Sequence, residues 1–212
     1  MRASILLFFL ILSSALRAQE IIPPMDIPLF LSGNFGELRS NHFHSGLDFK
    51  TQGRQGIAVK AVKEGFVSRI SVSPYGYGRA IYIDHPDGTT TVYGHLSRFA
   101  PAIESAVRDS QYIRESFSLN LVYAEPSFPV KQGEVIAYSG NTGGSGGPHL
   151  HFEIRDTKSE HPIDPLPFYQ KKISDTRPPE LRSIRLYPQA GKGIVNNSSN
   201  DQTFAIVKNK AG

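Results

Sequence analysis

Short hydrophobic runs alternate with turn residues along most of the chain between residues 30 and 164. The runs are rich in β-branched and aromatic residues, as is typical of strands. The clearest are GIAVKAV, GFVSRISV, RAIYIDH and TTTVYGHL, and VKQGEVIAYSG contains a further strand. The Asp-Gly pair of DHPDGTT, between two of these runs, is a strong hairpin signal. The pattern therefore predicts a mostly β domain whose neighbouring strands run antiparallel.

One segment has helical rather than strand periodicity, PAIESAVRDSQYIRESF at residues 101–117. Its hydrophobic residues share one helical face, the pattern of a short amphipathic helix that packs on a sheet. These residues are Ile103, Ala106, Val107, Ile113 and Phe117. The following SLNLVYAEPSFPV is compatible with a loop or with a strand that is stopped by proline. We therefore expect one helix inserted among the strands.

Residues 1–18 have the pattern of a secretory signal peptide. A basic start at Arg2 precedes an apolar run from Ile5 to Leu12, and small residues follow to Ala18. The run has eight residues, whereas a membrane-spanning helix needs about twenty. We therefore expect cleavage before Gln19, no membrane span afterwards, and a secreted or periplasmic protein. An uncleaved anchor is the alternative.

Residues 171–212 differ from the preceding chain. KKISDTRPPE is rich in charge and proline, as is typical of a linker, and LRSIRLYP and TFAIVKN then resume a strand pattern. A segment of about forty residues cannot easily bury a core of its own. We expect an incomplete second β domain or an extension that packs on the first. The chain ends within this pattern, which suggests a fragment of a longer protein.

Charge and cysteine content narrow the chemistry. The formal charge is +4 over 212 residues, and it falls to +2 when the signal peptide is removed with Arg2 and Arg17. No basic run with interleaved aromatic residues accompanies this charge, so we expect no nucleic-acid partner. The chain has no cysteine, which excludes a thiolate metal site and a cysteine nucleophile. Any metal ion must therefore be held by histidine and carboxylate groups.

Two histidine-containing segments supply such groups. His44 and Asp48 are separated by three residues, and Gly46 between them lets the backbone bend so that both side chains can converge. His149 and His151 flank one leucine in a strand-like run and therefore share a face. Taken alone, either pair is also compatible with polar surface residues. Together, two histidines and one carboxylate would leave a fourth position open, as in catalytic zinc sites.

Three blocks, HFHSGLD, VYGHLS and GGPHLHFEI in that order, resemble the signature motifs of the lysostaphin-type (LytM-like) zinc endopeptidases, peptidase family M23. The flanking SGNFGELR and VKQGEVIAYSGNTGGSG are also similar to that family, and the resemblance covers roughly residues 30–168. We therefore expect a mostly β, antiparallel sandwich or barrel-like peptidase domain over residues 19–170, with a short inserted helix. The resemblance also implies hydrolysis of peptide bonds in the stem peptides or cross-bridges of bacterial peptidoglycan.

The resemblance implies a role for each of five residues. Zinc would be held by His44, Asp48 and His151, and the two remaining active-site histidines of the family fall on His95 and His149. Zinc lowers the pKa of its bound water to about 7, and an unligated histidine can take the proton and pass it to the leaving amine. We favour His149 as this base because it lies beside His151 on the strand. His95 is then an orienting or oxyanion-stabilising group, or a structural brace.

Several other features have simpler interpretations. Compared with compact members of the family, the chain inserts residues from about 98 to 129, which we expect to border the substrate groove. We expect His42 at the rim of the site, and His85 and His161 outside it. Glu153 shares the face of His151, and we expect it to support the site rather than to react.

Two other classes of protein remain open. One is a non-enzymatic relative that binds the cell wall or activates another hydrolase, although such relatives usually lack the metal ligands that this chain retains. The other is a protein-binding module with structural zinc, in which His149 or His95 would close the fourth position. The sequence leaves open which bond would be cut and the oligomeric state.

Overall fold

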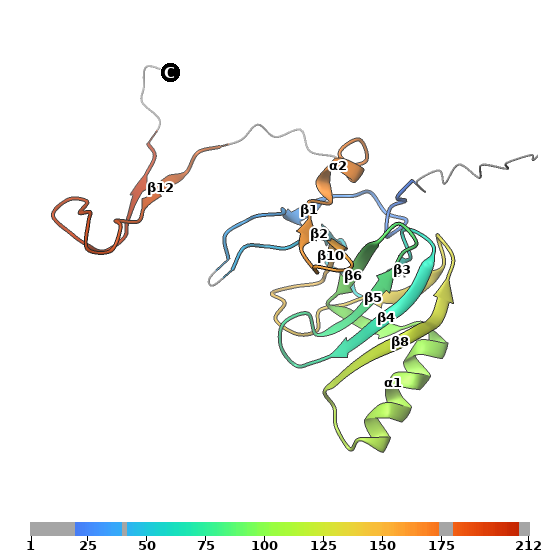
Figure 1. Cartoon of the computed structure of the whole chain (residues 1–212). Helices are drawn as coiled ribbons and strands as arrows, with labels where there is room; N and C mark the ends of the chain where they lie inside the picture. The colour runs from blue at the N-terminus through green and yellow to red at the C-terminus, as the bar shows by residue number, and fades with distance from the viewer. Residues whose placement is uncertain (1–19, 40–41, 174–179, 208–212) are drawn as a thin grey trace, which may run out of the picture. The chain divides into compact units, whose positions relative to one another are not determined.

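A computed structural model describes residues 20–39, 42–173 and 180–207, so the predicted signal peptide lies outside the described residues (Figure 1). The chain divides into two compact units, residues 1–174 and 175–212, and each is considered by itself. Among the residues that the structure describes, no helix is long and apolar enough to cross a membrane. The predicted domain boundary at residue 170 stays a prediction.

The first unit is mostly β, and its paired strands are antiparallel. The large sheet has the order β1-β2-β10-β6-β5-β4-β8, with β11 also paired to β10, and a smaller sheet has the order β3-β9-β7. The strands are β1 Leu31–Gly33, β2 Leu47–Lys50, β3 Ala58–Lys60, β4 Gly65–Val72, β5 Arg79–Asp84, β6 Thr89–Gly94, β7 Leu96–Phe99, β8 Leu119–Val130, β9 Val135–Ser139, β10 His149–Asp156 and β11 Pro162–Ile163. The predicted antiparallel β fold is therefore confirmed, and β5 and β6 form the predicted hairpin, with Gly88 of its turn at a φ of +78°.

One hydrophobic cluster joins the two sheets. It includes Tyr93 and Phe152 of the large sheet, Leu96 and Ile136 of the small one, and Tyr169 of the short helix α2, Leu166–Tyr169. Since side chains alternate along a strand, the residues between these core positions point to the opposite face of the large sheet. That outer face is where the histidines of β10 lie.

The inserted helix is confirmed, but it is shorter than predicted. Helix α1 spans Pro101–Ile113 and buries Ile103 and Val107, which contribute roughly 1.5–3 kcal/mol each. Ile113 is 83% exposed and Phe117 is 62% exposed, so the prediction that these two pack on the sheet was wrong. The helix ends because Glu115 adopts a φ of +47°, a left-handed conformation that turns the chain away from the helix axis.

The segment after α1 is a strand rather than a loop. Strand β8 pairs with β4 at one edge of the large sheet, and α1 lies along it, at the other end of the sheet from β1 and β2 (Figure 1). An edge strand needs ladder hydrogen bonds on one side only, so Pro126 and Pro129 do not stop it. The insertion is thus part of the main sheet.

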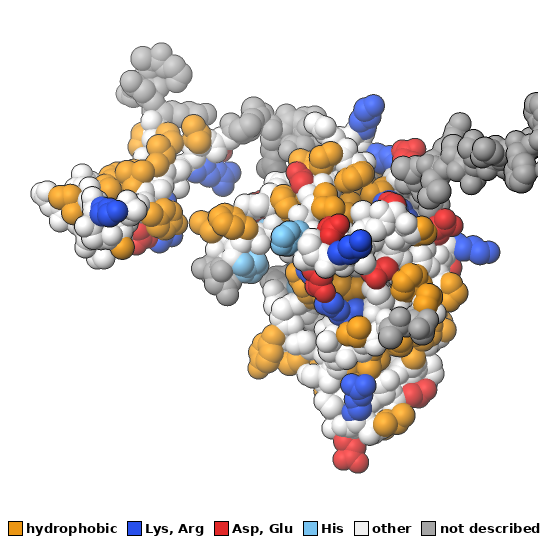
Figure 2. All heavy atoms as spheres, viewed as in Figure 1, with side chains coloured by type: hydrophobic (Ala, Val, Ile, Leu, Met, Phe, Trp, Pro, Cys, Tyr) orange, Lys and Arg blue, Asp and Glu red, His pale blue; other side chains and the backbone are white. Residues whose placement is uncertain are grey.

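The second unit contains the two strands predicted in the tail, β12 Ser183–Leu186 paired with β13 Gln202–Ala205. Its hydrophobic side chains are exposed, for example Ile184 at 50% and Tyr187 at 61%, and Figure 2 shows such side chains over much of its visible surface. A two-stranded hairpin is marginally stable by itself. The expectation of an incomplete second β domain or a packing extension stays a prediction.

Candidate metal centre

The structure brings His44, Asp48 and His151 together from distant parts of the sequence. Asp48 on β2 lies opposite His151 on β10 in the antiparallel ladder, although the two are 103 residues apart. His44 lies just before β2, and Gly46 lets this segment run against β10. A Cβ atom on Gly46 would lie 2.2 Å from the carbonyl oxygen of Phe152, so a larger residue does not fit there.

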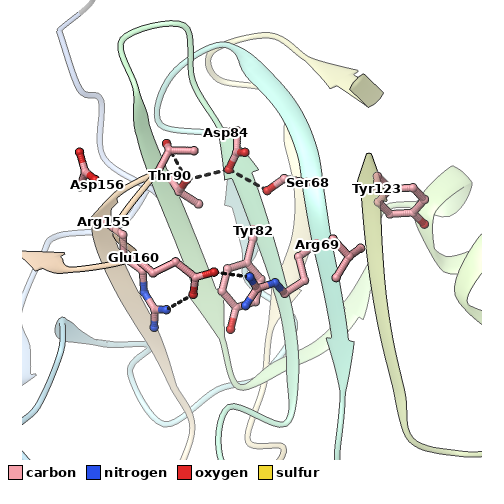
Figure 3. A pocket seen from close by; sticks show the side chains of 11 residues that line it. Ser68, Arg69, Tyr82, Asp84, Thr90, Tyr123, Arg155, Asp156 and Glu160 are labelled. Atoms are coloured by element: carbon pink, nitrogen blue, oxygen red, sulfur yellow. Dashed lines mark hydrogen bonds and ion pairs between the residues drawn. The ribbon is translucent and has the colours of Figure 1, made fainter. Parts of the chain in front are cut away.

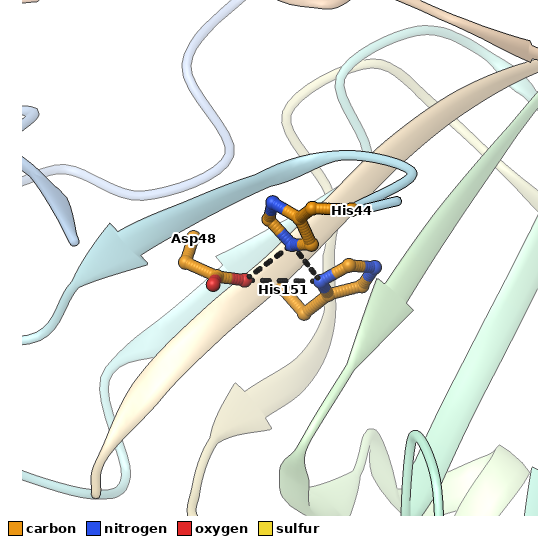
Figure 4. Close-up of side chains that lie close together, drawn as sticks. All are labelled: His44, Asp48 and His151. Carbon is orange, nitrogen blue, oxygen red and sulfur yellow. Dashed lines mark hydrogen bonds and ion pairs between the residues drawn. The ribbon is translucent and has the colours of Figure 1, made fainter. Parts of the chain in front are cut away.

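The three side chains converge with one atom each (Figure 4). His44 Nε2 lies 3.0 Å from His151 Nδ1, and Asp48 Oδ1 lies 3.1 Å from the first and 3.0 Å from the second. All three residues are buried. A tetrahedral zinc ion with bonds of about 2.0–2.1 Å places its ligand atoms roughly 3.3 Å apart. The observed spacing therefore suits zinc.

Hydrogen bonds on the far side of each ring determine which nitrogen faces the centre. His44 Nδ1 lies 2.7 Å from the carbonyl oxygen of Asn34, which can only accept, so Nδ1 carries the proton. His151 Nε2 lies 2.7 Å from Glu153 Oε1 and donates to that carboxylate. Both nitrogens that face Asp48 therefore present lone pairs. Three acceptor atoms this close repel one another unless a cation lies between them, and the donor set fits zinc.

Arg39 orients the carboxylate of the centre. Its Nη2 lies 3.0 Å from Asp48 Oδ2, which leaves Oδ1 for a metal ion. Gly33 makes room for this pair, since a Cβ atom there would lie 2.4 Å from Oδ2 and 2.5 Å from the guanidinium.

Glu153 supports His151 from behind. It is fully buried and accepts hydrogen bonds from His151 Nε2 at 2.7 Å, Ser45 Oγ at 2.6 Å, the Tyr77 hydroxyl at 2.5 Å and Arg155 Nε at 2.6 Å. Burial would raise its pKa, but its hydrogen bonds with His151 and Arg155 and the charge of Arg155 lower the pKa of Glu153 to about 2. It is therefore ionised at neutral pH and fixes the tautomer of His151.

Tyr77 also stacks on the His151 ring, with centroids 4.9 Å apart. Sequence reasoning did not single out Tyr77, Ser45 or Arg155. The one available signal was the pair of glycines around Tyr77: Gly76 and Gly78 adopt φ values of +57° and +65° and let this loop reach the site.

His149 lies beside the three convergent residues. Its Nδ1 is 2.8 Å from the carbonyl oxygen of Gly147 and donates to it, so Nε2 carries a lone pair. That Nε2 lies 3.5 Å from Asp48 Oδ1. The His149 ring also lies 4.6 Å from the ring of His95, measured between centroids. The two histidines are therefore neighbours at the centre.

His95 is held between β6 and β7 in a left-handed conformation, with a φ of +58°, which costs a non-glycine residue about 1–3 kcal/mol. Its backbone N–H donates to the carbonyl of Tyr77 at 2.8 Å, and its Nδ1 donates to the carbonyl of Thr142 at 2.8 Å. Burial lowers the pKa of His95 to about 4. The imidazole is therefore neutral at pH 7, and its Nε2 accepts rather than donates hydrogen bonds.

All five predicted residues line one open cavity of about 380 Å³, a size typical of ligand sites. His42 also lines it and is exposed, as expected of a rim residue. His85 is buried elsewhere, against the carbonyl of Glu64 and the Thr91 hydroxyl, and His161 is exposed. Figure 2 shows histidine side chains at the surface of the face in view.

Two histidines and one carboxylate with further histidines beside them, on the open face of an antiparallel sheet, are typical of a metal-dependent hydrolase. The family model described as peptidase family M23 matches residues 42–126 and 117–165. These segments make up more than half of the chain, so the chain belongs to peptidase family M23, a family of zinc metallopeptidases. The resemblance inferred from the three motifs is thereby confirmed.

Individual relatives match the same region. The DD-carboxypeptidase/endopeptidase Mpg of Neisseria meningitidis is 33% identical over 129 residues, which are 61% of this chain and 23% of that protein. Lysostaphin of Staphylococcus simulans is 31% identical over 128 residues, which are 59% of this chain and 21% of that protein. A structure of that antimicrobial peptidase has a TM-score of 0.50 at 26% identity and covers 68% of this chain and 50% of that one. This chain thus spans less than a quarter of the length of these curated relatives.

Proposed function

We propose that this protein is a secreted or periplasmic zinc endopeptidase that hydrolyses peptide bonds in the stem peptides or cross-bridges of bacterial peptidoglycan. The observation that carries the proposal is the convergence of three lone-pair acceptors, His44 Nε2, Asp48 Oδ1 and His151 Nδ1, within 3.1 Å of one another. Peptide-bond hydrolysis is supported by the names of the relatives, an endopeptidase and an antimicrobial peptidase.

A zinc ion held by these three residues would polarise the scissile carbonyl and supply a water molecule of lowered pKa. Around it, Arg39 keeps Oδ1 of Asp48 turned inward, and Glu153 keeps the lone pair of His151 Nδ1 turned inward. The unprotonated Nε2 of His149 then takes the water proton and passes it to the leaving amine. Such general acid–base assistance contributes about 10²–10⁴ in rate.

His95 has a narrower role in this proposal. Its Nδ1 proton is committed to the Thr142 carbonyl, so its Nε2 accepts a hydrogen bond from the attacking water. A neutral His95 in this tautomer does not donate to an oxyanion. Of the two roles considered from the sequence, orientation is therefore favoured over oxyanion stabilisation.

The test is digestion of purified peptidoglycan by the chain of residues 19–212, with the released fragments identified by mass spectrometry. We expect fragments with new amino termini, and we expect chelation of zinc or the variant His44→Ala to abolish them. His161→Ala, which removes an exposed histidine outside the cavity, should leave release unchanged. Undiminished release by metal-free protein would contradict the zinc mechanism. Tight zinc binding without cleavage of any wall or peptide would instead support a non-enzymatic wall-binding or hydrolase-activating protein.

A further inference from the structure

The outer face of the large sheet continues past the metal centre. On β10, Glu153 and Arg155 follow His151 on the same face. Across the strands, Glu153 lies opposite Val92, and Val92 lies opposite Tyr82. Tyr82, Val92 and Ala80 form a small buried cluster with Tyr77 packed against it. An apolar floor therefore leads from the ring stacked on His151 to a second cavity.

This second cavity, the Tyr82 cavity, has a volume of about 160 Å³ and is lined by side chains of five strands (Figure 3). Tyr82 is its floor, 7% exposed. The guanidinium of Arg69 lies 4.7 Å from the centroid of the Tyr82 ring, and that of Arg155 lies 5.8 Å from it. Glu160 accepts hydrogen bonds from both arginines, at 2.6 Å and 3.4 Å. Two guanidiniums thus converge on one carboxylate over an aromatic ring.

The opposite end of the cavity carries negative charge. Asp84 Oδ1 accepts hydrogen bonds from Ser68 and Thr90, each at 2.7 Å, and Asp156 lines the same end (Figure 3). Figure 3 shows this acidic end apart from the two arginines and Glu160. A ligand with only a negative charge would be repelled by the carboxylates, and one with only a positive charge would be repelled by the guanidiniums. A group that carries both charges can be attracted at both ends of the cavity.

Glu160 is held loosely compared with the arginines. Its side chain is 53% exposed and lies on the turn after β10, and exposed ion pairs of this kind contribute only about 0–1 kcal/mol. Arg155 is also fixed by Glu153 at 2.6 Å and by the Tyr77 hydroxyl at 3.2 Å, and Arg69 is fixed by the Tyr82 ring. An incoming carboxylate can therefore replace Glu160 while the guanidiniums stay in place.

Size and position suit one group of a longer peptide. Pockets that enclose whole drug-sized ligands measure about 300–1,000 Å³, so a cavity of about 160 Å³ holds a single side-chain or terminal group. Along β10, Arg155 lies four residues beyond His151, or about 13 Å, which an extended peptide spans with about four residues. Val122 and Tyr123 of β8 form one wall, so the inserted segment borders this cavity.

We propose that the Tyr82 cavity is a subsite for a zwitterionic amino-acid group, with a free ammonium and a free carboxylate on one carbon, about four residues from the scissile bond. The carboxylate replaces Glu160 between Arg69 and Arg155, and the ammonium faces Asp84. The position relative to the scissile bond rests on the proposed peptidase function, whereas binding of the group does not.

The test is an NMR titration of the zinc-loaded chain with γ-glutamylglycinamide, which carries the free ammonium and carboxylate on one carbon. Two matched compounds are its N-acetyl derivative and its α-carboxamide. We expect each to bind at least tenfold more weakly than the parent, and we expect Arg69→Gln and Asp84→Asn each to weaken parent binding at least tenfold. Arg108→Gln, on the exposed side of α1, should have no effect. Glu160→Gln should tighten parent binding because it frees both guanidiniums.

The amino-acid group can also chelate zinc directly, so the titration is repeated with zinc removed. Binding that survives zinc removal and is lost in Arg69→Gln supports the subsite. Binding that is lost with zinc and unchanged in Arg69→Gln and Asp84→Asn overturns it, as does equal binding of all three compounds. Peptidoglycan cleavage without such binding overturns only the subsite, whereas binding without cleavage overturns only the proposed function.

Discussion

The metal centre and the Tyr82 cavity lie on the same face of the same sheet and share strand β10, but the sequence encodes them differently. At the metal centre, His44 and Asp48 are four residues apart, and His151 belongs to a second short motif. In the cavity, Arg69, Tyr82 and Arg155 each come from a different strand and are brought together by strand register. The metal-site residues can be recognised in the sequence because they belong to short histidine-containing motifs. The cavity residues form no such motif, because each belongs to a separate strand.

The two regions are also joined through one pair of side chains. Arg155 of the cavity donates to Glu153, and Glu153 accepts from the metal-side ring of His151. Among the described residues, Glu153 and Tyr77 beside it therefore link the cavity to the metal centre. Variants of the proposed ligand Asp48, the proposed base His149 and the supporting Glu153 test how far the two regions are independent.

The largest expected effects distinguish the roles of Asp48 and His149 at the metal centre. Asp48→Ala removes a proposed ligand and leaves two facing imidazoles, so we expect loss of zinc and of all hydrolysis. His149→Ala removes the proposed base, which lies outside the convergent triangle, so we expect zinc to be retained and the turnover rate to fall by about 10²–10⁴. Zinc content by elemental analysis and the rate of peptide release are measured on both.

His42→Ala is the matched control, since it removes a histidine at the rim of the same cavity. It should keep both zinc and turnover. Absence of zinc from His149→Ala would contradict the assignment and make His149 a ligand. The structural-zinc interpretation, in which this residue closes the fourth position, would then gain support.

A smaller effect is expected from the support behind His151. Glu153→Gln removes the charge that holds the Nε2 proton of His151 and leaves Arg155 without its buried partner. Loss of such an outer partner typically weakens metal affinity by about 10–100-fold, which is measurable by competition with a chromophoric chelator.

Glu160→Gln is the control for this variant. Glu160 pairs with the same Arg155 but from the Tyr82 cavity, at 3.4 Å. We expect unchanged zinc affinity. An equal loss of zinc affinity in both variants would show that the charges of the cavity and of the metal centre are coupled, and would contradict the expectation that Glu160 affects the cavity alone.

The same contrast explains what could be predicted from the sequence. Strands such as GFVSRISV, residues 65–72, were placed because β-branched residues recur between turn signals, and β4 has these bounds. The metal site could be predicted because HFHSGLD keeps His44 and Asp48 close in sequence, and the HxH motif marks His151 as a second histidine-containing segment. The tail strands followed from the same pattern, since LRSIRLYP contains β12.

The failures come from tertiary context. Ile113 and Phe117 satisfy helical periodicity, but the chain turns at Glu115 and leaves both exposed. Prolines made β8 compatible with a loop, because its position at the sheet edge is invisible in one sequence. Tyr77 was missed for a related reason: its contacts with Glu153 and His151 depend on a loop path that periodicity does not encode.

The smallest expected effect comes from the residue that touches both regions. Tyr77→Phe removes a hydroxyl that donates to Glu153 at 2.5 Å and accepts from Arg155 at 3.2 Å, while the ring stacked on His151 stays. Glu153 keeps three other donors, so we expect zinc affinity to fall less than tenfold. We also expect a loss of about 1.5–3 kcal/mol of stability, as for other hydrogen bonds to charged groups. Tyr75→Phe, in the same loop but 79% exposed, is the control and should change neither quantity. Chelator competition measures the zinc affinity, and thermal unfolding with and without zinc measures the stability.

If Tyr77→Phe weakened zinc binding as much as Glu153→Gln, the hydroxyl rather than the carboxylate charge would be the main support of His151. The two regions would then be coupled through the loop of Tyr77 and not through β10.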